Sequence, residues 1–414
     1  MNSFTLTPGS VNIRFGAGAV SQLPEIIVGL GKKKIFIVTD PGVAAAGVLA
    51  KVEMILASAG LEAASYAEIK PNPTTTLIDA AAKVGISFGA DCIVALGGGS
   101  SLDSSKGIAL VSANPTFSSA KFDYSITPEC PALPIIAIPT TSGTGSETNN
   151  WGVIDDPIRQ CKFYVGDSST TPVAAILDPE LTIGLPPRPT AGTGIDALTH
   201  AIESLTSKGR TPVSAAYAHE AIKLISKSLP IAVKDGKNVD ARGDMLMGAH
   251  LAGLALTLSG LGLVHGIAHS VSAHVGTAHG EALATVLPEV MEFNSREVSD
   301  IYGTVGNDMG VSSNSASAIE AVRDLSDSIN IRNSLSHYGV KQEMIGDIAK
   351  TVLADSVTSN NPIAPTEGEG QQSPYLQRTY PSFATLWSEG EFTHLCDTLY
   401  ARLYQCVGQK APKA

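Results

Sequence analysis

The sequence predicts a two-domain protein, with an α/β domain built on a parallel, Rossmann-like sheet over residues 1–185 and an all-helical domain over residues 186–414. Two observations carry this prediction. Before residue 186, runs of β-branched and apolar residues alternate with Ala- and Leu-rich segments, the pattern of a parallel sheet covered on both faces. After a proline cluster at residues 186–189, apolar residues recur every 3.6 positions or so and β-branched runs almost disappear, which favours helices.

The elements of the first half follow in order along the chain. Residues 35–39 are expected to form a buried strand, and residues 42–59 the helix after it. A helix over residues 77–88 leads to a strand over 92–96, which runs into a glycine-rich turn and a further helix. The last strand, 134–138, ends in a turn of small residues at 139–146.

The second half is expected to be helical throughout. The expected helices cover residues 193–206, 213–233, 240–258, 265–274, 280–294 and 316–337. The segment after Thr366 is first rich in Pro, Gly and Ser, and a last helix is expected at 393–406. The domain boundary therefore falls near residue 186.

Composition excludes several classes of protein. The 414 residues include 28 Lys and Arg against 39 Asp and Glu, a net charge of −11, so the chain lacks the basic surface of a nucleic-acid or anionic-membrane binder. No apolar run is long enough to span a bilayer, and no signal peptide is evident. Five widely spaced cysteines form neither a disulfide framework nor a thiolate zinc site, so we expect a cytoplasmic protein.

Two turns of small residues follow predicted strands and suit a bound pyrophosphate. The first, Gly97-Gly98-Gly99-Ser100, opens a helix, whose N-terminal N–H groups favour an anion, and its glycines let the ligand approach the backbone. The second spans residues 140–146 and includes Thr140, Thr141 and Thr144. One such turn is often only a tight strand–helix connection. Two at the carboxyl edge of one sheet favour a nucleotide site.

Asp40 comes directly after the first predicted strand. A carboxylate at that place can accept a hydrogen bond from a ribose 2′-hydroxyl and would repel a 2′-phosphate. It can equally be the N-cap of the following helix. The residues alone leave both readings open.

Histidines gather in the helical half and predict a metal site. Asp196 and His200 lie four residues apart in one helical run, so their side chains leave the same face a turn apart. His265 and His269 repeat this spacing, and His274 and His279 follow within ten residues. A single histidine on an Ala-rich helix is usually a hydrogen-bonded core residue, but this cluster favours a divalent cation. Without a nearby thiolate, Fe(II), Zn(II) and Mn(II) all remain open.

Together with further motifs, these residues carry a family likeness. The motifs run in order: Pro71-Asn72-Pro73-Thr74, the first glycine turn with Asp103 and Lys106, residues 139–147, residues 193–203, residues 265–280, and the late pairs Asn361-Pro362 and Pro365-Thr366. The chain resembles the iron-dependent (group III) alcohol dehydrogenases, which include lactaldehyde reductases and 1,3-propanediol dehydrogenases. The likeness covers residues 5–366 and implies the dehydroquinate synthase-like architecture.

The resemblance implies reversible hydride transfer between NAD and a primary alcohol or small diol, in a cleft between a dinucleotide-binding and a metal-binding domain. It implies the metal ligands Asp196, His200, His265 and His279, with Fe(II) as the metal and Zn(II) as the alternative, and His269 as the catalytic proton relay. The implied NAD contacts are Asp40, Asn72, Gly97, Gly98, Gly99, Ser100, Asp103, Thr140, Thr141, Thr144, Lys162 and Leu181. A homodimer or larger homo-oligomer is also implied.

Two departures from the family concern the substrate and the tail. After Glu147 the family continues with small or β-branched residues, whereas this chain has Asn149 and Trp151, which we assign to the substrate side. Trp151 is equally compatible with an ordinary core residue. The 48 residues after Thr366 exceed the family's usual short tail.

The main alternative is a metal- and NAD-dependent lyase of the dehydroquinate synthase type. Such an enzyme must bind a phosphorylated acid and would need several Lys or Arg in its cleft. The segments around Asp196, His265 and His279 carry almost none, which favours the dehydrogenase.

Overall fold

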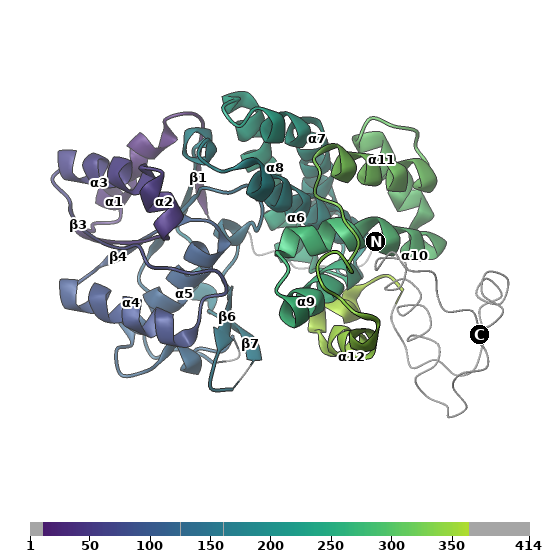
Figure 1. Ribbon diagram of the computed structural model, residues 1–414. Coiled ribbons are helices and arrows are strands. Elements are labelled where there is room, and N and C mark those ends of the chain that lie inside the picture. The colour runs from purple at the N-terminus through teal and green to yellow at the C-terminus, as the bar shows by residue number, and fades with distance from the viewer. Residues whose placement is uncertain (1–10, 125, 160, 364–414) are drawn as a thin grey trace.

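The computed structural model describes residues 11–363 apart from 125 and 160. Its α/β part and its helical part lie side by side, in purple to blue and in teal to yellow-green (Figure 1). Among the described helices, no single one is long and apolar enough to cross a membrane, and one pair bent by 104°, Val239–Ser259 with Leu263–Val275, passes the length and composition test together.

Six parallel strands form the main sheet, in the order β1-β8-β5-β4-β2-β3. Their bounds are β1 Asn12–Phe15, β2 Lys34–Val38, β3 Glu62–Tyr66, β4 Cys92–Gly97, β5 Ile135–Pro139 and β8 Ala174–Leu177. The parallel Rossmann-like sheet predicted from the sequence is confirmed. The strands β1, β3 and β8 were not predicted, because β1 and β8 have only four residues each and because β1 and β3 are partly exposed at the edges of the sheet.

Alternate residues of the central strands face opposite layers of helices. Phe36 and Val38 of β2 pack into one cluster with Ile78 of α4, whereas Ile35 and Ile37 pack into another with residues of α1 and α3. The helices are α1 Leu23–Gly29, α2 Pro41–Ala45, α3 Val48–Ser58, α4 Thr75–Phe88 and α5 Gly99–Ala113. Figure 1 shows α1 and α3 on one side of the sheet and α4 and α5 on the other.

The helix expected over residues 42–59 was wrong as one element. Asp40 caps the short α2, and the chain then turns at Gly47, whose φ of +78° is left-handed, before α3 begins. An antiparallel hairpin, β6 Gly152–Asp156 with β7 Cys161–Val165, was also not predicted. It follows the second turn of small residues and stands apart from the main sheet.

The described chain after β8 is helical, as predicted. Its helices are α6 Pro187–Thr206, α7 Pro212–Lys234, α8 Val239–Ser259, α9 Leu263–Val275, α10 His279–Asp308, α11 Ser315–Ser328 and α12 Ile345–Ala354. Short 3-10 turns include η3 Ser146–Thr148, η5 Pro179–Thr182 and η7 Ser356–Asn360. The helix expected over 316–337 ends early, and α10 continues past residue 294 through a kink at Val298.

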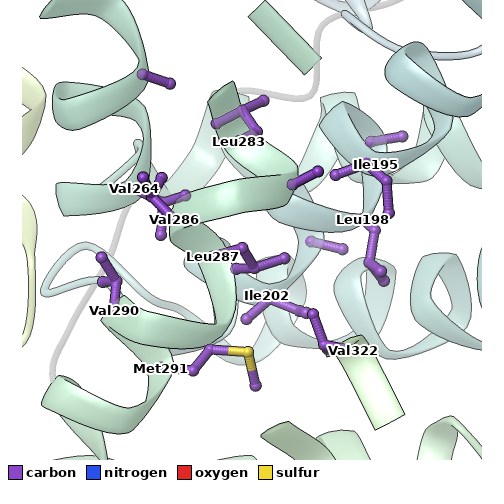
Figure 2. Close-up of a cluster of buried hydrophobic side chains, with 14 of the residues drawn as sticks. Ile195, Leu198, Ile202, Val264, Leu283, Val286, Leu287, Val290, Met291 and Val322 are labelled. Atoms are coloured by element: carbon purple, nitrogen blue, oxygen red, sulfur yellow. The ribbon is translucent and has the colours of Figure 1, made fainter. Parts of the chain in front are cut away.

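One apolar cluster joins these helices. Figure 2 shows Ile195, Leu198 and Ile202 of α6 facing Leu283 and Leu287 of α10. Because α6 and α10 also carry predicted metal ligands, this core fixes the distance between them. The boundary after residue 185 stays a prediction, and the helix expected at 393–406 lies outside the described residues.

Candidate metal and cofactor site

Helix α6 presents the first two predicted metal ligands. Both Asp196 and His200 are about 5% exposed, and the four-residue spacing places the His200 Nε2 atom 3.2 Å from Asp196 Oδ1. Core packing holds α6 in place here, because apolar residues lie on the faces of the helix beside Asp196 and His200. The predicted shared face of Asp196 and His200 is therefore present.

Two further helices bring imidazoles to the same carboxylate oxygen. His265 lies in the first turn of α9, with its Nε2 atom 3.5 Å from Asp196 Oδ1, and His279 opens α10, with its Nε2 atom 3.7 Å away. Neither Asp196 Oδ1 nor His265 Nε2 has a hydrogen-bond partner in the described chain, although both atoms are buried. Unpaired buried polar atoms are costly, and nitrogen and oxygen ligands in this set fit a divalent cation.

The electrostatics of the cluster also fit a cation. Burial would raise the pKa of Asp196, but the adjacent imidazoles, His200 foremost, hold that pKa well below its usual range. Burial lowers the pKa of His200 to about 4 and that of His279 to about 3, so both imidazoles stay neutral at pH 7. Neutral imidazole and ionised carboxylate are the forms that bind metal.

His265 differs because a second carboxylate binds its other nitrogen. Its Nδ1–H donates to Glu203 Oε2 over 2.6 Å. Burial by itself lowers the pKa of His265, but Glu203 and Asp196 outweigh burial and raise it to about 9. Glu203 also accepts from the backbone N–H groups of Gly262 (3.0 Å) and Val264 (2.7 Å), so one carboxylate caps α9 and orients its ligand.

His269, the predicted proton relay, lies beside the ligands. Its ring stacks on that of His279, with centroids 5.3 Å apart, and stands edge-on to His265 at 5.9 Å. Its Nδ1–H donates to Asp355 Oδ2 over 2.8 Å. The side chain is 34% exposed, which leaves the ring accessible to solvent and to a substrate. His274 donates its Nδ1–H to the Ser270 carbonyl instead and takes no part in the cluster.

The two small-residue turns meet at the carboxyl edge of the sheet. A Cβ on Gly98 would lie 3.2 Å from Thr141, and a Cβ on Gly99 would lie 2.6 Å from Thr144. Gly97 has a φ of +147°, and Gly98 is the N-cap of α5. The two predicted turns therefore lie against each other, with the threonine side chains of the second turn on the glycines of the first and the N–H groups of the first turn of α5 at this edge.

The other predicted cofactor residues fall into three places. Asp40 lies next to the first turn: its Oδ1 caps α2, and its Oδ2 accepts from Ser101 Oγ over 3.3 Å. Asn72, with a φ of +52°, accepts from Lys162 Nζ over 3.3 Å. Leu181 is buried in the apolar cluster beneath the sheet. Cofactor contact by each of these residues, and by Ser100 and Thr140, stays a prediction.

Asp103 and Lys106, both on α5, bind the segment that contains the residues assigned to the substrate. Asp103 accepts from Ser146 Oγ (2.5 Å) and from the Val153 N–H (3.0 Å), and burial raises its pKa. Lys106 Nζ donates to Asn149 Oδ1 (2.7 Å) and to the Trp151 carbonyl (2.5 Å). The Trp151 ring is half-buried and stands edge-on to Tyr124, 6.2 Å away. Contact with substrate stays a prediction for both Asn149 and Trp151.

Comparison with known proteins identifies the family. Residues 10–179 match the model of the iron-containing alcohol dehydrogenases, and residues 190–372 match the C-terminal model of the Fe-containing alcohol dehydrogenase family. The chain belongs to this family. It is 36% identical to the NAD-dependent methanol dehydrogenase of Bacillus methanolicus, over 87% of this chain and 96% of that protein. It is 38% identical to lactaldehyde reductase of Escherichia coli K12, over 84% and 93%.

Solved structures agree with this assignment. The crystal structure of a 1,3-propanediol oxidoreductase matches with a TM-score of 0.81 and 34% identity, over 85% of this chain and 94% of that one. A sulfoacetaldehyde reductase from Bifidobacterium kashiwanohense, solved in complex with NAD+, matches with a TM-score of 0.80 and 30% identity, over 88% and 96%. The predicted two-domain architecture and alcohol dehydrogenase activity are confirmed at the level of the family.

Sequence reasoning missed two carboxylates of this alcohol dehydrogenase. Glu203 lies seven residues after Asp196, two turns further along the same face of α6, and that spacing was a usable signal. Asp355 gave no such signal, because it is 86 residues from His269 and lies in the short segment before η7.

Proposed function

We propose that this alcohol dehydrogenase transfers a hydride between NAD and a primary alcohol or small diol, with Fe(II) held by Asp196, His200, His265 and His279. The observation that carries the proposal is the convergence of three imidazole nitrogens within 3.2–3.7 Å of one buried carboxylate oxygen, next to His269. The names of the relatives support the substrate class, and the NAD+ complex of one of them supports the cofactor.

When bound, the metal supplies a Lewis acid that lowers the pKa of an alcohol hydroxyl, and the nicotinamide supplies the hydride acceptor. The protein's own part begins with placement. Asp196, His200 and His265 are buried, so water has little access to the ligand side of the cluster. Glu203 fixes the ring of His265 and leaves its Nε2 directed at Asp196 Oδ1.

His269 is the group that moves the proton. Because Asp355 binds its Nδ1–H, the ring is fixed and its Nε2 is the atom left for exchange with substrate or water. The ring is a third exposed and stacked on His279, so it can receive the hydroxyl proton at the edge of the cluster and pass it to solvent. A bound nicotinamide would supply the acceptor for the hydride on the carbon that carries this hydroxyl.

The α/β part orients the cofactor. The first-turn N–H groups of α5 suit the pyrophosphate, with Gly98 and Gly99 leaving no side chain in the way. Asp40 places its Oδ2 beside Gly97, since a Cβ on that glycine would lie 3.1 Å from it. A carboxylate there favours a 2′-hydroxyl and disfavours a 2′-phosphate. Asp40→Ser would keep the N-cap and lose the charge, so we expect NADPH use to rise relative to NADH.

The test follows NADH absorbance with metal-free protein reloaded with Fe(II) or Zn(II) and a panel of short primary alcohols and diols. We expect metal-dependent NADH formation that is lost in His265→Ala and kept in His337→Ala, whose exposed ring stands edge-on to that of Tyr338. Silence over the whole panel with both metals would refute the proposal. Activity that survives in His265→Ala would refute the assigned metal site.

The substrate side and the assembly belong to the same proposal. Trp151 and Asn149 bound the alcohol pocket in our assignment, so Trp151→Ala should lower KM for longer alcohols relative to ethanol.

We also propose a cytoplasmic homodimer or larger homo-oligomer. The family likeness supports the oligomer, and the free thiols of Cys92 and Cys130 suit a reducing compartment. Light scattering and cell fractionation test these two statements.

A further inference from the structure

A buried hydrogen bond joins the second small-residue turn to the helical domain. Glu147, in η3, and His250, in the middle of α8, are 3% and 1% exposed, and Glu147 Oε1 lies 3.0 Å from His250 Nδ1. The residues lie 103 positions apart in the sequence. The mechanism above uses neither of them.

The backbone around this pair fits closely. Gly145 has a φ of +63°, and a Cβ on it would lie 2.5 Å from the Cα of Gly253. One turn further along α8, Thr257 Oγ1 lies 3.4 Å from Thr148 Oγ1. His250, Gly253 and Thr257 share one face of α8, so this face and the turn are in direct contact over about two helical turns.

The opposite side of the same turn carries the cofactor residues. Thr141 and Thr144 pack against Gly98 and Gly99 so closely that no Cβ fits between them and Gly99. Ser146 is bonded to Asp103 and to Lys106, both on α5. A turn held this tightly on both sides transmits a displacement at α8 to the first glycine turn.

The chemistry of His250 does not favour a role in stability alone. Its Nε2 is buried and has no hydrogen-bond partner in the described chain. Burying a polar nitrogen without a partner costs free energy that an apolar side chain of similar size would not incur. The one hydrogen bond that the imidazole makes in the described chain goes to the carboxylate of Glu147, directly after the second small-residue turn.

We propose that His250 is a positioning residue for the cofactor: by holding Glu147 it fixes the turn with Thr140, Thr141 and Thr144 over the first glycine turn, so helix α8 sets the affinity for NAD. This inference rests on the proposed function, in which NAD binds between the two turns. His250 acts at a distance, because its buried ring is enclosed between α8 and η3.

The experiment measures NADH binding to the iron-loaded protein by isothermal calorimetry, beside kcat, KM for NAD and metal content. We expect His250→Ala to weaken NADH binding about tenfold or more, the usual size of a lost hydrogen bond to a charged group. The metal content and the kcat at saturating NAD should stay within about twofold of the unmodified protein. The lost contact stabilises bound NAD equally in the ground state and in the transition state, so its removal changes KM for NAD and leaves kcat unchanged. His250→Asn, whose amide replaces Nδ1, should restore most of the affinity.

Two further variants separate positioning from general damage. His219→Ala removes another histidine–carboxylate pair, with Asp308, which joins α7 to α10 and has no contact with the turn. It should leave NADH affinity unchanged. Glu147→Gln keeps the size of the side chain, and it keeps the test valid should His250→Ala not fold. It should weaken NADH binding severalfold, and the double variant Glu147→Gln/His250→Ala should be no weaker than the worse single variant.

Three results would overturn the inference. These are unchanged NADH affinity in folded His250→Ala or in Glu147→Gln, an equal loss in His219→Ala, or additive losses in the double variant. Failure of the unmodified protein to bind NADH would be a different result, because it would refute the proposed function itself.

Discussion

Glu203→Gln tests how the metal cluster is oriented. The carboxylate accepts three hydrogen bonds: its Oε1 binds the Val264 N–H, and its Oε2 binds the Gly262 N–H and the Nδ1–H of His265. A glutamine has nearly the same shape, but one of these two atoms becomes an amide that donates. Whichever way the amide turns, a backbone N–H at the start of α9 loses its acceptor.

The structure gives the size of the effect. A buried N–H left without an acceptor costs about 1–3 kcal/mol. If the NH2 group of the new glutamine faces His265, the imidazole must accept a hydrogen bond at Nδ1. Its proton then lies on Nε2, the atom that has to bind the metal. Loss of such an orienting partner lowers metal affinity about 10- to 100-fold. We therefore expect a folded, less stable protein with much weaker metal binding.

The assay is a competition between the protein and a chelator for Zn(II), read beside thermal unfolding of the metal-free protein. Glu180→Gln is the matched control, because Glu180 forms an ion pair with Lys51 that is 42% exposed on both sides and lies on the α/β part. The control should change neither readout. Unchanged Zn(II) affinity in Glu203→Gln would show that Glu203 does not orient His265, and the account of the cluster would fail.

Three more predictions follow from the same geometry. The pKa of His265 is raised to about 9. The proton on this imidazole therefore stabilises the metal-free fold fully below pH 6.5, and this stabilisation is lost as the pH rises through 9. A metal must displace the same proton, so the affinity for Zn(II) should rise about tenfold per pH unit up to pH 9. A pH-independent affinity would contradict this. Gly99→Ala should weaken NADH binding at least about tenfold, whereas Gly29→Ala, with open space around its Cβ, should not, as calorimetry can show. Asp355→Asn should lower kcat about 10- to 100-fold by freeing the His269 ring; a change confined to KM for the alcohol would argue against that role.

The fold was predictable where signals in the sequence are local. The buried strands β2, β4 and β5 are continuous apolar runs, and the helices from α6 to α10 keep one apolar face. Short edge strands such as β1 carry little such signal, since exposed positions accept many residue types. The break between α2 and α3 depends on the left-handed Gly47, which an Ala-rich helical pattern hides.

The residues of the site were likewise predictable only where their signal in the sequence is local. Asp196 and His200 were predictable because four-residue spacing on a helix fixes their neighbourhood before any tertiary contact forms. Their convergence with His265 and His279 depends on the packing of α6, α9 and α10. The residue pattern alone showed only that histidines cluster there, and the full set of ligands came from the family resemblance. Lys106 was known as part of a motif, yet its four oxygen contacts with the segment 146–151 are tertiary and had no local signal.

The contacts that could not be predicted share one arrangement, a hydrogen bond between the Nδ1 of a histidine and a carboxylate of another element. His265, His269 and His250 each place Nδ1 on a carboxylate from another element: Glu203 of α6, Asp355 before η7 and Glu147 of η3. An imidazole bound at Nδ1 has a fixed tautomer and a fixed ring plane, so its Nε2 becomes a defined ligand or proton carrier, or the ring becomes a fixed support. Because each carboxylate also joins two elements, the contacts that set the chemistry of the site are the ones that align the helices around it. We therefore expect a single substitution among these carboxylates to change both the function of the site and the stability of the fold.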